Sequence, residues 1–409
     1  MTNDILLPIP APVQFVLDRL EGAGFHAWVV GGCVRDALMG RIPGDYDVTT
    51  SALPAEMQEI FSDCRVVETG LKHGTLTVVR QGMNVETTTY RIDGAYNDGR
   101  HPDSVTFTDQ LSDDLCRRDF TVNAMAYSPQ RGLVDLFGGR EDLDNCTIRC
   151  VGRAADRFSE DGLRILRAMR FSSTLGFTPD EECAEAIHSL KHLLDKISRE
   201  RIYAELTKLL CGKTASAVLR DFPDVAAHAL PPLTEAGVSC AAETIAADEQ
   251  LPGTPDPALR YALLLDSLTD EEARAAVNSL KPSKDEKNAV LAILDNRNNP
   301  VSAEEYAVLR LMSNCGDDFP GKYARFARDT ERIDSELMRK VGDTAEKLTR
   351  EDRPRRLNQL AIGGRDLSVL GITGAALGNA LKNLLDAVMR GECQNEKECL
   401  LRYVRQTSK

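Results

Sequence analysis

The spacing of apolar residues changes along the first part of the chain. Between about residues 15 and 150, short runs rich in Val, Thr and Ile alternate with segments in which apolar residues recur every three or four positions. The short runs predict strands, and the other segments predict amphipathic helices. Their alternation indicates a mixed α/β domain. The expected strands are HAWVVGG (26–32), GTLTVVRQG (74–82), NVETTTYRI (84–92), SVTFTDQ (104–110) and CTIRCVG (146–152), and the expected helices are PVQFVLDRL (12–20) and PAEMQEIFSDC (54–64).

The pattern changes after residue 151, where strand signals give way to helical periods. Leu377, Leu381, Leu384, Leu385 and Val388, for example, follow the spacing of one helix face. The second half is therefore expected to be all-helical. A chain of 409 residues is long enough for two to four domains.

Composition places the chain among ordinary globular proteins, with 28% charged and 42% hydrophobic residues. The start MTNDILLPIPAPVQ lacks a basic segment followed by a long apolar run, and no stretch approaches 18 apolar residues. We therefore expect a cytoplasmic protein with no membrane partner. The eleven cysteines form no CxxC pair and do not cluster with the six histidines, which argues against a zinc site and favours reduced thiols.

The net charge of −13 argues against extended, nonspecific binding of nucleic acid, because neutralising phosphates requires Lys and Arg. Binding depends on local patches, however, and a whole-chain sum does not exclude a compact site. The arginines that can supply such patches lie in RPRRL (353–357), at 117–118 and between 164 and 170.

Asp45 and Asp47, in GDYDVTT (44–50), are the strongest chemical signal. Carboxylates at i and i+2 of an extended segment point the same way. The upstream turn Gly31-Gly32 allows backbone to approach phosphate oxygens, and Arg35 follows as a phosphate partner. Alone, each pattern usually marks a turn. Together they predict a magnesium site beside a triphosphate, which suggests nucleotidyl transfer.

Five segments carry a resemblance to a known family. They are VVGGCVRDALMG with GDYDVTT (29–50), RRDFTVNAMAY (117–127), DLFGGREDL (135–143), EDGLRILRAMRF (160–171) and SRERIYAEL (198–206). In order and spacing they resemble the five motifs of the class II tRNA nucleotidyltransferase and bacterial poly(A) polymerase family.

The resemblance implies an α+β protein. Its expected parts are a nucleotidyltransferase head similar to DNA polymerase beta (1–150), a helical neck that selects the nucleotide (151–220), and a helical body and tail that bind tRNA (221–409). The implied substrates are tRNA, CTP and ATP, with Mg²⁺ held by the catalytic carboxylates Asp45 and Asp47, and with no DNA partner.

The segment 160–171 is expected to be one helix, with Leu163, Leu166 and Met169 on one side and Asp161, Arg164 and Arg167 on the other. Cytosine and adenine both offer an amino donor beside a ring-nitrogen acceptor. A carboxylate can accept from the amino group, and a guanidinium can donate to the ring nitrogen. With uracil or guanine, both protein groups would be left without a hydrogen-bond partner. This chemistry agrees with what the resemblance implies for Asp161 and Arg164, namely selection of CTP and ATP without a nucleic-acid template.

The resemblance also assigns further contacts. Gly32, Arg35 and Arg118 are implied to bind the triphosphate and sugar, and Arg167 and Arg170 to extend the nucleotide pocket. Glu160 and Arg167 are expected to support the base-reading pair. A two-metal site usually has a third carboxylate, for which Glu86 and Asp135 are both candidates. Cys33, inside the glycine turn, is expected to fill space and not to act as a nucleophile.

Two features favour a full CCA-adding member of the family. The segment RIDGAYNDGRHPDSV (91–105) resembles the flexible loop that CC-only members lack or shorten, and QLAIGGRDLSVLGITG (359–374) resembles the tail of compact CCA-adding members. The alternatives are a poly(A) polymerase, which tends to carry a basic C-terminal extension, and an A-only or CC-only tRNA nucleotidyltransferase. An inactive RNA-binding relative is disfavoured because both carboxylates of the Asp45–Asp47 pair are present.

Overall fold

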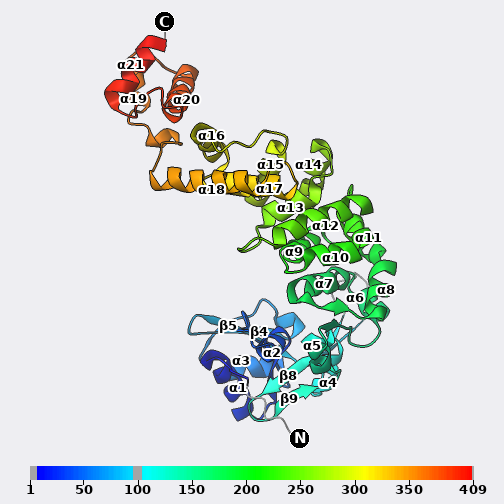
Figure 1. Cartoon of the computed structure of the whole chain (residues 1–409). Helices are drawn as coiled ribbons and strands as arrows, with labels where there is room; N and C mark the ends of the chain where they lie inside the picture. The colour runs from blue at the N-terminus through cyan, green and yellow to red at the C-terminus, as the bar shows by residue number, and fades with distance from the viewer. Residues whose placement is uncertain (1–6, 95–103, 408–409) are drawn as a thin grey trace. The chain divides into compact units, whose positions relative to one another are not determined.

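A computed structural model describes residues 7–94 and 104–407 of the chain (Figure 1). Most of the loop expected at 91–105 lies outside these residues. The chain forms two compact units, Met1–Val238 and Ser239–Lys409, which are described separately. Neither predicted boundary, at 150 or 220, coincides with this division, and the division into head, neck, and body with tail stays a prediction.

Unit 1 begins with a seven-stranded sheet of order β3-β4-β5-β2-β1-β8-β9. All neighbours in it are antiparallel except β2 and β5, which run parallel. The strands are β1 (Ala27–Val30), β2 (Asp47–Thr50), β3 (Arg65–Val67), β4 (Thr75–Arg80), β5 (Met83–Thr89), β8 (Met125–Ser128) and β9 (Gly132–Asp135). A separate two-stranded sheet pairs β6 (Arg91–Asp93) with β7 (Val105–Phe107) in antiparallel orientation. The mixed α/β head expected from the alternating pattern is confirmed.

The continuous apolar run of β1 is explained by burial on both sides of the sheet. Ala27 and Val29 belong to one core cluster, whereas Trp28 and Val30 belong to another. The first cluster includes Leu17 of helix α1 (Ala11–Gly22). The other helices of this sheet region are α2 (Gly32–Leu38), α3 (Pro54–Ile60), α4 (Leu111–Cys116) and α5 (Gly139–Asp144).

The rest of unit 1 is helical apart from one short parallel pair, β10 (Thr147–Ile148) with β11 (Thr178–Pro179). The expectation of no strand beyond residue 151 is therefore wrong at β11. The helices are α6 (Ala154–Glu160), α7 (Leu163–Phe171), α8 (Glu181–Ser189), α9 (Arg199–Leu210), α10 (Ala215–Asp221) and α11 (Pro223–Ala229), and the turn η4 (Lys191–Lys196) lies between α8 and α9.

The single helix expected over 160–171 is also wrong. Helix α6 ends at Glu160, Asp161 is extended with φ −140° and ψ 105°, and α7 begins at Leu163. A tertiary contact lies at the break, where a Cβ on Gly162 would lie 2.9 Å from the backbone oxygen of Leu193, so this position has no room for a side chain.

Unit 2 is all-helical within the residues that the structure describes, as the sequence predicts. Its core gathers Leu309, Val341, Leu348 and Leu384 among other apolar residues. The division between the units falls within α12 (Glu235–Glu249), and the following helices are α13 (Pro257–Leu265), α14 (Asp270–Ser279), α15 (Lys284–Asn296), α16 (Glu305–Cys315), α17 (Phe319–Asp329), α18 (Ser335–Arg350), α19 (Gly364–Ser368), α20 (Ala375–Met389) and α21 (Lys397–Thr407), with the turn η5 (Leu357–Gln359) before α19.

The remaining global expectations concern membranes and cysteines. Over residues 7–94 and 104–407, no helix is both long enough and apolar enough to cross a bilayer. The eleven cysteines are free thiols, as the sequence predicts.

Candidate active site

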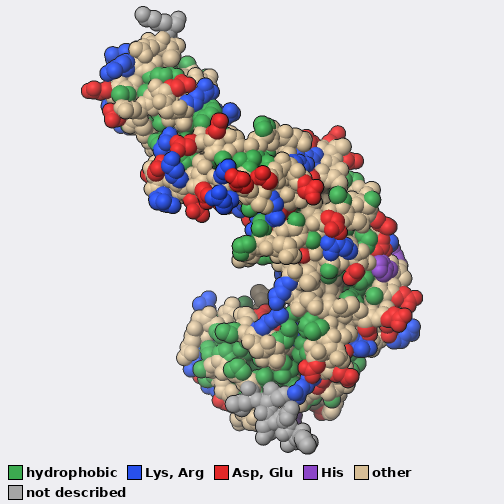
Figure 2. Space-filling view, in the orientation of Figure 1, with side chains coloured by type: hydrophobic (Ala, Val, Ile, Leu, Met, Phe, Trp, Pro, Cys, Tyr) green, Lys and Arg blue, Asp and Glu red, His purple; other side chains and the backbone are tan. Residues whose placement is uncertain are grey.

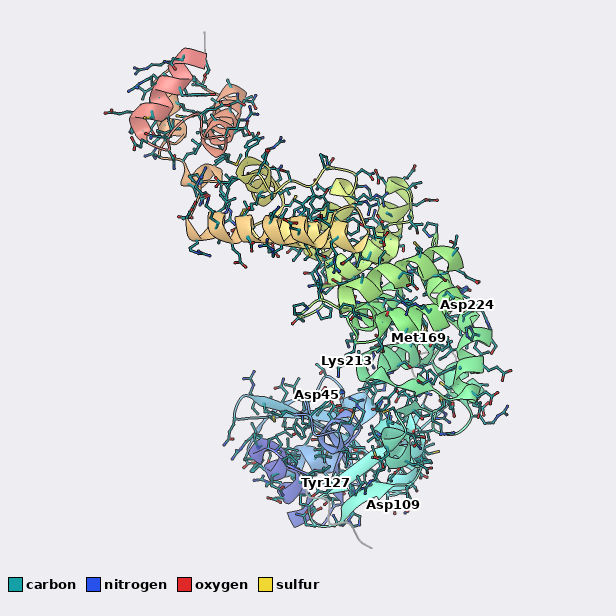
Figure 3. All side chains as sticks on the ribbon, in the orientation of Figure 1. Asp45, Asp109, Tyr127, Met169, Lys213 and Asp224 are labelled. Atoms are coloured by element: carbon teal, nitrogen blue, oxygen red, sulfur yellow. The ribbon has the colours of Figure 1, made fainter. Side chains whose placement is uncertain are left out.

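Asp45 and Asp47 lie where β2 begins, and they face the same side. Asp45 and Asp47 are exposed, whereas Tyr46 and Val48 between and after them are buried. This alternation is the period of an extended chain, so the expected common direction of the two carboxylates is observed. Figure 3 labels Asp45 at this edge of the sheet.

Glu86 is the carboxylate that the fold brings to this pair. Strands β2 and β5 are parallel neighbours, and their register places Glu86 opposite Asp47. The pKa of Asp47 is raised to about 6, first by loss of water around the carboxylate and then by repulsion from Glu86 and Asp45, while Arg118 lowers it. Of these causes, the repulsion from Glu86 and Asp45 is the one that bears on metal binding. An excess of like charge at one place favours a divalent cation.

Asp135, the other candidate for a third carboxylate, has a structural task. Its oxygens accept hydrogen bonds from the backbone N–H groups of Gly139 and Arg140, both at 2.8 Å, and thereby cap helix α5. Its strand β9 is three strands from β2, which is roughly 14 Å at ordinary strand spacing. The geometry favours Glu86.

The donor set fits Mg²⁺, which prefers carboxylate oxygens and keeps several waters. The described residues contain no group of three or more His, Cys, Asp or Glu side chains already gathered around one point. The candidate ligands are Asp45 and Asp47, and Glu86 lies opposite Asp47 on the neighbouring strand.

Within the predicted glycine turn, Gly31 is the position that disfavours any side chain, although only Gly32 was predicted to contact the ligand. Gly31 has φ 81° and ψ −133°, a conformation that side chains disfavour, and a Cβ there would lie 3.1 Å from Nη1 of Arg118. Gly32 is the first residue of α2 and has ordinary space around it, since a Cβ on Gly32 would lie 3.5 Å from Nη2 of Arg35. The turn brings the Arg118 guanidinium against the backbone that precedes α2.

Asp114 is a second residue that the sequence motifs did not reveal. It is fully buried, and its carboxylate accepts hydrogen bonds from Arg117, from Arg118 and from the hydroxyl of Thr49 in β2. Burial raises the pKa of Asp114, but the positive charges of Arg117 and Arg118 outweigh burial and lower it below the ordinary value. Asp114 thus fixes Arg118 next to the strand that carries Asp47.

Three of the predicted arginines gather around the ring of Phe171, the last residue of α7. The guanidinium carbons of Arg170, Arg35 and Arg167 lie 3.8, 5.2 and 5.5 Å from the ring centroid. Arg35 is buried and donates from Nη1 to Oδ1 of Asn123 at 2.6 Å. The structure therefore brings together arginines from α2 and α7, and Phe171 is the common surface on which they lie.

Asp119 balances the charge of Arg167, one of these three arginines. Its Oδ2 accepts hydrogen bonds from Nε and Nη2 of Arg167 at 2.8 and 2.5 Å. Burial raises the pKa of Asp119, but the charges of Arg167 and Arg164 prevail and bring it down to about 2. Asp119 lies in RRDFTVNAMAY, so the motif contained this signal, although its partner was not predicted.

Asp161 and Arg164 lie at the break between α6 and α7, and in this structure each has another partner. Asp161 Oδ1 accepts from the N–H of Leu163 at 3.0 Å, and Oδ2 accepts from Nη2 of Arg201 at 2.7 Å. Arg164 is buried and pairs with Glu160 at 2.5 Å. Glu160 was expected to support the base-reading pair, and it does contact Arg164. Arg167 was expected to do the same, but it binds Asp119 and contacts neither Asp161 nor Arg164.

Cys33 has the environment of a space-filling thiol. It is buried and donates to the carbonyl oxygen of Val30 at 3.3 Å. Burial first, and then the charge of Asp47, raise its pKa to about 11. The thiol is therefore protonated at neutral pH and is a poor nucleophile.

Unit 2 holds a basic pocket of about 870 Å³. Cationic side chains line it, and among the described residues Arg310 and Lys382 have no carboxylate partner. The pocket is formed by parts of α16, η5 and α20, and its cations are Arg310, Arg355, Arg356, Lys382 and Arg390. Nearby α18 shows Lys and Arg interspersed with Asp and Glu (Figure 2).

Two family models match the chain. One, described as the poly A polymerase head domain, matches residues 27–149, and the other, described as a probable RNA and SrmB-binding site of polymerase A, matches residues 176–225. Both candidate metal ligands lie within the first match.

Curated relatives and solved structures agree with these models. The CCA-adding enzyme of Geobacillus kaustophilus is 37% identical, over 94% of this chain and 93% of that protein. The CCA-adding enzyme of Lactobacillus delbrueckii subsp. bulgaricus is 46% identical over 54% of this chain. That match spans about half of the relative's own length, 56%. The crystal structure of the Bacillus stearothermophilus CCA-adding enzyme in complex with CTP is similar with a TM-score of 0.82 and 31% identity, over 98% of both chains.

Proposed function

The chain belongs to the family of CCA-adding enzymes, and on that premise we propose that it adds C, C and A to the 3′ end of tRNA, taking CTP and ATP without a nucleic-acid template and releasing pyrophosphate. The observation that carries the proposal is the exposed pair of Asp45, just before β2, and Asp47, the first residue of β2, with Glu86 opposite Asp47. We propose the cytoplasm as its location.

In the proposed reaction, the 3′-hydroxyl of the RNA attacks the α-phosphate of the bound nucleotide in line. Asp45 and Asp47 would hold Mg²⁺, with Glu86 as the third carboxylate. When bound, this ion supplies charge that activates the hydroxyl and stabilises the leaving oxygens. The work of the protein is positioning and charge neutralisation.

Arg118 and Arg35 are the proposed partners of the triphosphate and sugar. Arg118 lies against Gly31, where the missing side chain lets the guanidinium approach the backbone of the turn, and Asp114 holds Arg118 there. Arg35 extends from α2 to Phe171. Arg167 and Arg170 would continue this positive surface along α7.

Asp161 and Arg164 are the proposed readers of the base. The carboxylate would accept from the amino group of cytosine or adenine, and the guanidinium would donate to the adjacent ring nitrogen. Uracil and guanine present the reverse pattern, so they would leave both protein groups without partners. Protein side chains would thereby replace a template.

The basic pocket of unit 2 is the proposed contact with the tRNA backbone. Arg310 and Lys382 are available to phosphates because no described carboxylate neutralises them. Replacing both with Ala should weaken tRNA binding and lower the slope of log affinity against log salt by up to about 2, since each lost phosphate contact removes about 0.9. An unchanged slope would remove the pocket from the RNA interface.

The test of the function is product sizing on two acceptors, one tRNA that ends at its discriminator base and one that ends in CC. A tRNA that ends at its discriminator base is incubated with CTP, with ATP, or with both. Two added residues with CTP alone and three with both nucleotides support full CCA addition. Long tails from ATP alone indicate a poly(A) polymerase. Two added nucleotides, both with CTP alone and with CTP plus ATP, indicate CC-only addition. Addition of A only to tRNA ending in CC indicates an A-only enzyme, and no addition indicates an inactive relative.

A further inference from the structure

Helix α9 packs against α7, the helix that follows the proposed base-reading break. Both helices carry buried apolar residues, including Ile202 and Leu206 on α9 and Leu166 and Met169 on α7. Figure 3 labels Met169 on this helix. Apolar packing sets the distance between two helices, but it tolerates some rotation about their axes. Polar contacts are needed to fix which residues face the nucleotide.

Two ion pairs supply such contacts at the two ends of α7. Arg201 on α9 pairs with Asp161 just before α7, with 2.7 Å between Nη2 and Oδ2. Glu205, one turn further along α9, pairs with Arg170 near the end of α7, with 2.5 Å between Oε2 and Nε. The four side chains are between 9% and 22% exposed, so solvent screens these pairs less than it screens surface pairs.

The orientation of the Asp161 side chain depends on Arg201 more than it would if Asp161 were part of a helix. Its backbone is extended, so the geometry of α7 does not dictate where its side chain points. One carboxylate oxygen, Oδ1, is used by the N–H of Leu163, and the other, Oδ2, is oriented by Arg201. A carboxylate oxygen has a second lone pair, which Arg201 leaves available to a further donor.

We propose that Arg201 is a positioning residue for base selection, which orients the Asp161 carboxylate toward the amino group of the incoming base, while Glu205 anchors the far end of α7 through Arg170. The inference rests on the proposed function. It assigns a role in nucleotide selection to Arg201, which lies outside the base-reading segment. Loss of Arg201 should change which nucleotide is accepted, because a carboxylate held within a few tenths of an ångström discriminates between bases better than a mobile one.

The test compares kcat/KM for CTP with kcat/KM for UTP on one tRNA acceptor. Arg201→Gln removes the charge but keeps a side chain of similar length, and it should lower the CTP/UTP ratio roughly tenfold, within the range given by losing a whole base contact. Arg201→Lys should give an intermediate ratio, because an ammonium keeps the charge but lacks the planar donor geometry. If Arg201→Gln does not fold, Arg201→Lys decides alone, and a wild-type ratio in it overturns the proposal.

The matched control is Lys191→Ala, which breaks an ion pair of similar exposure in the same unit. Lys191 on η4 and Asp224 on α11 are 2.6 Å apart, and neither belongs to the proposed site. A merely structural role for Arg201 would make the two variants alike, with lower thermal stability and an unchanged CTP/UTP ratio. That result overturns the proposal.

A double-mutant cycle tests the route through Asp161. If Arg201 acts by orienting this carboxylate, Arg201→Gln should change the ratio no further once Asp161 is Ala. Additive effects would mean that Arg201 acts elsewhere and would overturn the proposal. If the wild-type protein adds no CTP at all, the proposed function itself fails. If the wild-type protein adds CTP but the Arg201 variants keep the wild-type CTP/UTP ratio of kcat/KM, only the proposed role of Arg201 is overturned.

Discussion

The ion pair between buried Asp119 and half-buried Arg167 leads to a quantitative prediction about the stability of unit 1. The pKa of Asp119 is about 2, against an ordinary value of 3.8, because the charges of Arg167 and Arg164 overcome the opposing effect of burial. One pKa unit corresponds to about 1.4 kcal/mol, so the ionised carboxylate contributes roughly 2 kcal/mol to the free energy of unfolding at neutral pH. Asp119→Asn should lose about this amount at pH 7.

The sign of the pH dependence follows from the lowered pKa. The contribution is complete above the unfolded pKa near 4 and disappears as pH falls toward about 2, because protonation then removes the charge in the folded state also. The difference between wild type and Asp119→Asn should therefore be constant from pH 7 to 5 and shrink steadily below pH 4.

Urea unfolding followed by tryptophan fluorescence measures this difference. The chain has one tryptophan, Trp28, buried in β1, so its emission reports on unit 1. Asp63→Asn serves as the control, since Asp63 pairs with Arg19 on the exposed surface of the same unit and such pairs contribute little. Equal stability of Asp119→Asn and wild type at pH 7, or a difference that persists undiminished at pH 3, would refute the assignment of Asp119 as a buried carboxylate that is charged in the folded state.

Three further results are expected. Asp45→Ala or Asp47→Ala should lower turnover by about three orders of magnitude or more while tRNA affinity measured by filter binding stays near wild type, and near-normal turnover would place the metal elsewhere. Asp161→Ala or Arg164→Ala should lower the CTP/UTP ratio of kcat/KM by about 5- to 150-fold, and a wild-type ratio would make them structural. Burial first raises the pKa of Asp329 to about 7, so the stability of unit 2 should fall as pH rises from about 4 to about 7. Asp329→Asn should abolish that fall in thermal unfolding followed by circular dichroism, and a slope like that of wild type would contradict the assignment.

Local patterns were sufficient to predict the framework of the head. The run Trp28–Val30 reads as a buried strand because every residue in it is apolar, and the structure buries it on both faces. The common direction of Asp45 and Asp47 follows from the two-residue period of an extended chain, which no tertiary contact alters here.

Contacts between distant segments were beyond the reach of these patterns. The apolar spacing of Leu163, Leu166 and Met169 fits one helix, and nothing in that spacing indicates that Asp161 is extended and that α7 begins only at Leu163. Spacing likewise left Glu86 and Asp135 equivalent, because strand order decides between them and the order is a property of the folded sheet.

Arg164 shows how a residue can serve both a structural and a reading role. Its Nη1 donates to Glu160 and to the carbonyl oxygen of Arg157, and its Nη2 donates to the carbonyl oxygen of Arg117. A guanidinium has five N–H donors in one plane, so three such contacts fix the plane and leave two donors for a ligand. Arg164 therefore need not release its protein partners to donate to a ring nitrogen. Because the ordering of this side chain is complete before the nucleotide arrives, less free energy of binding is spent on it, and discrimination between bases gains accordingly.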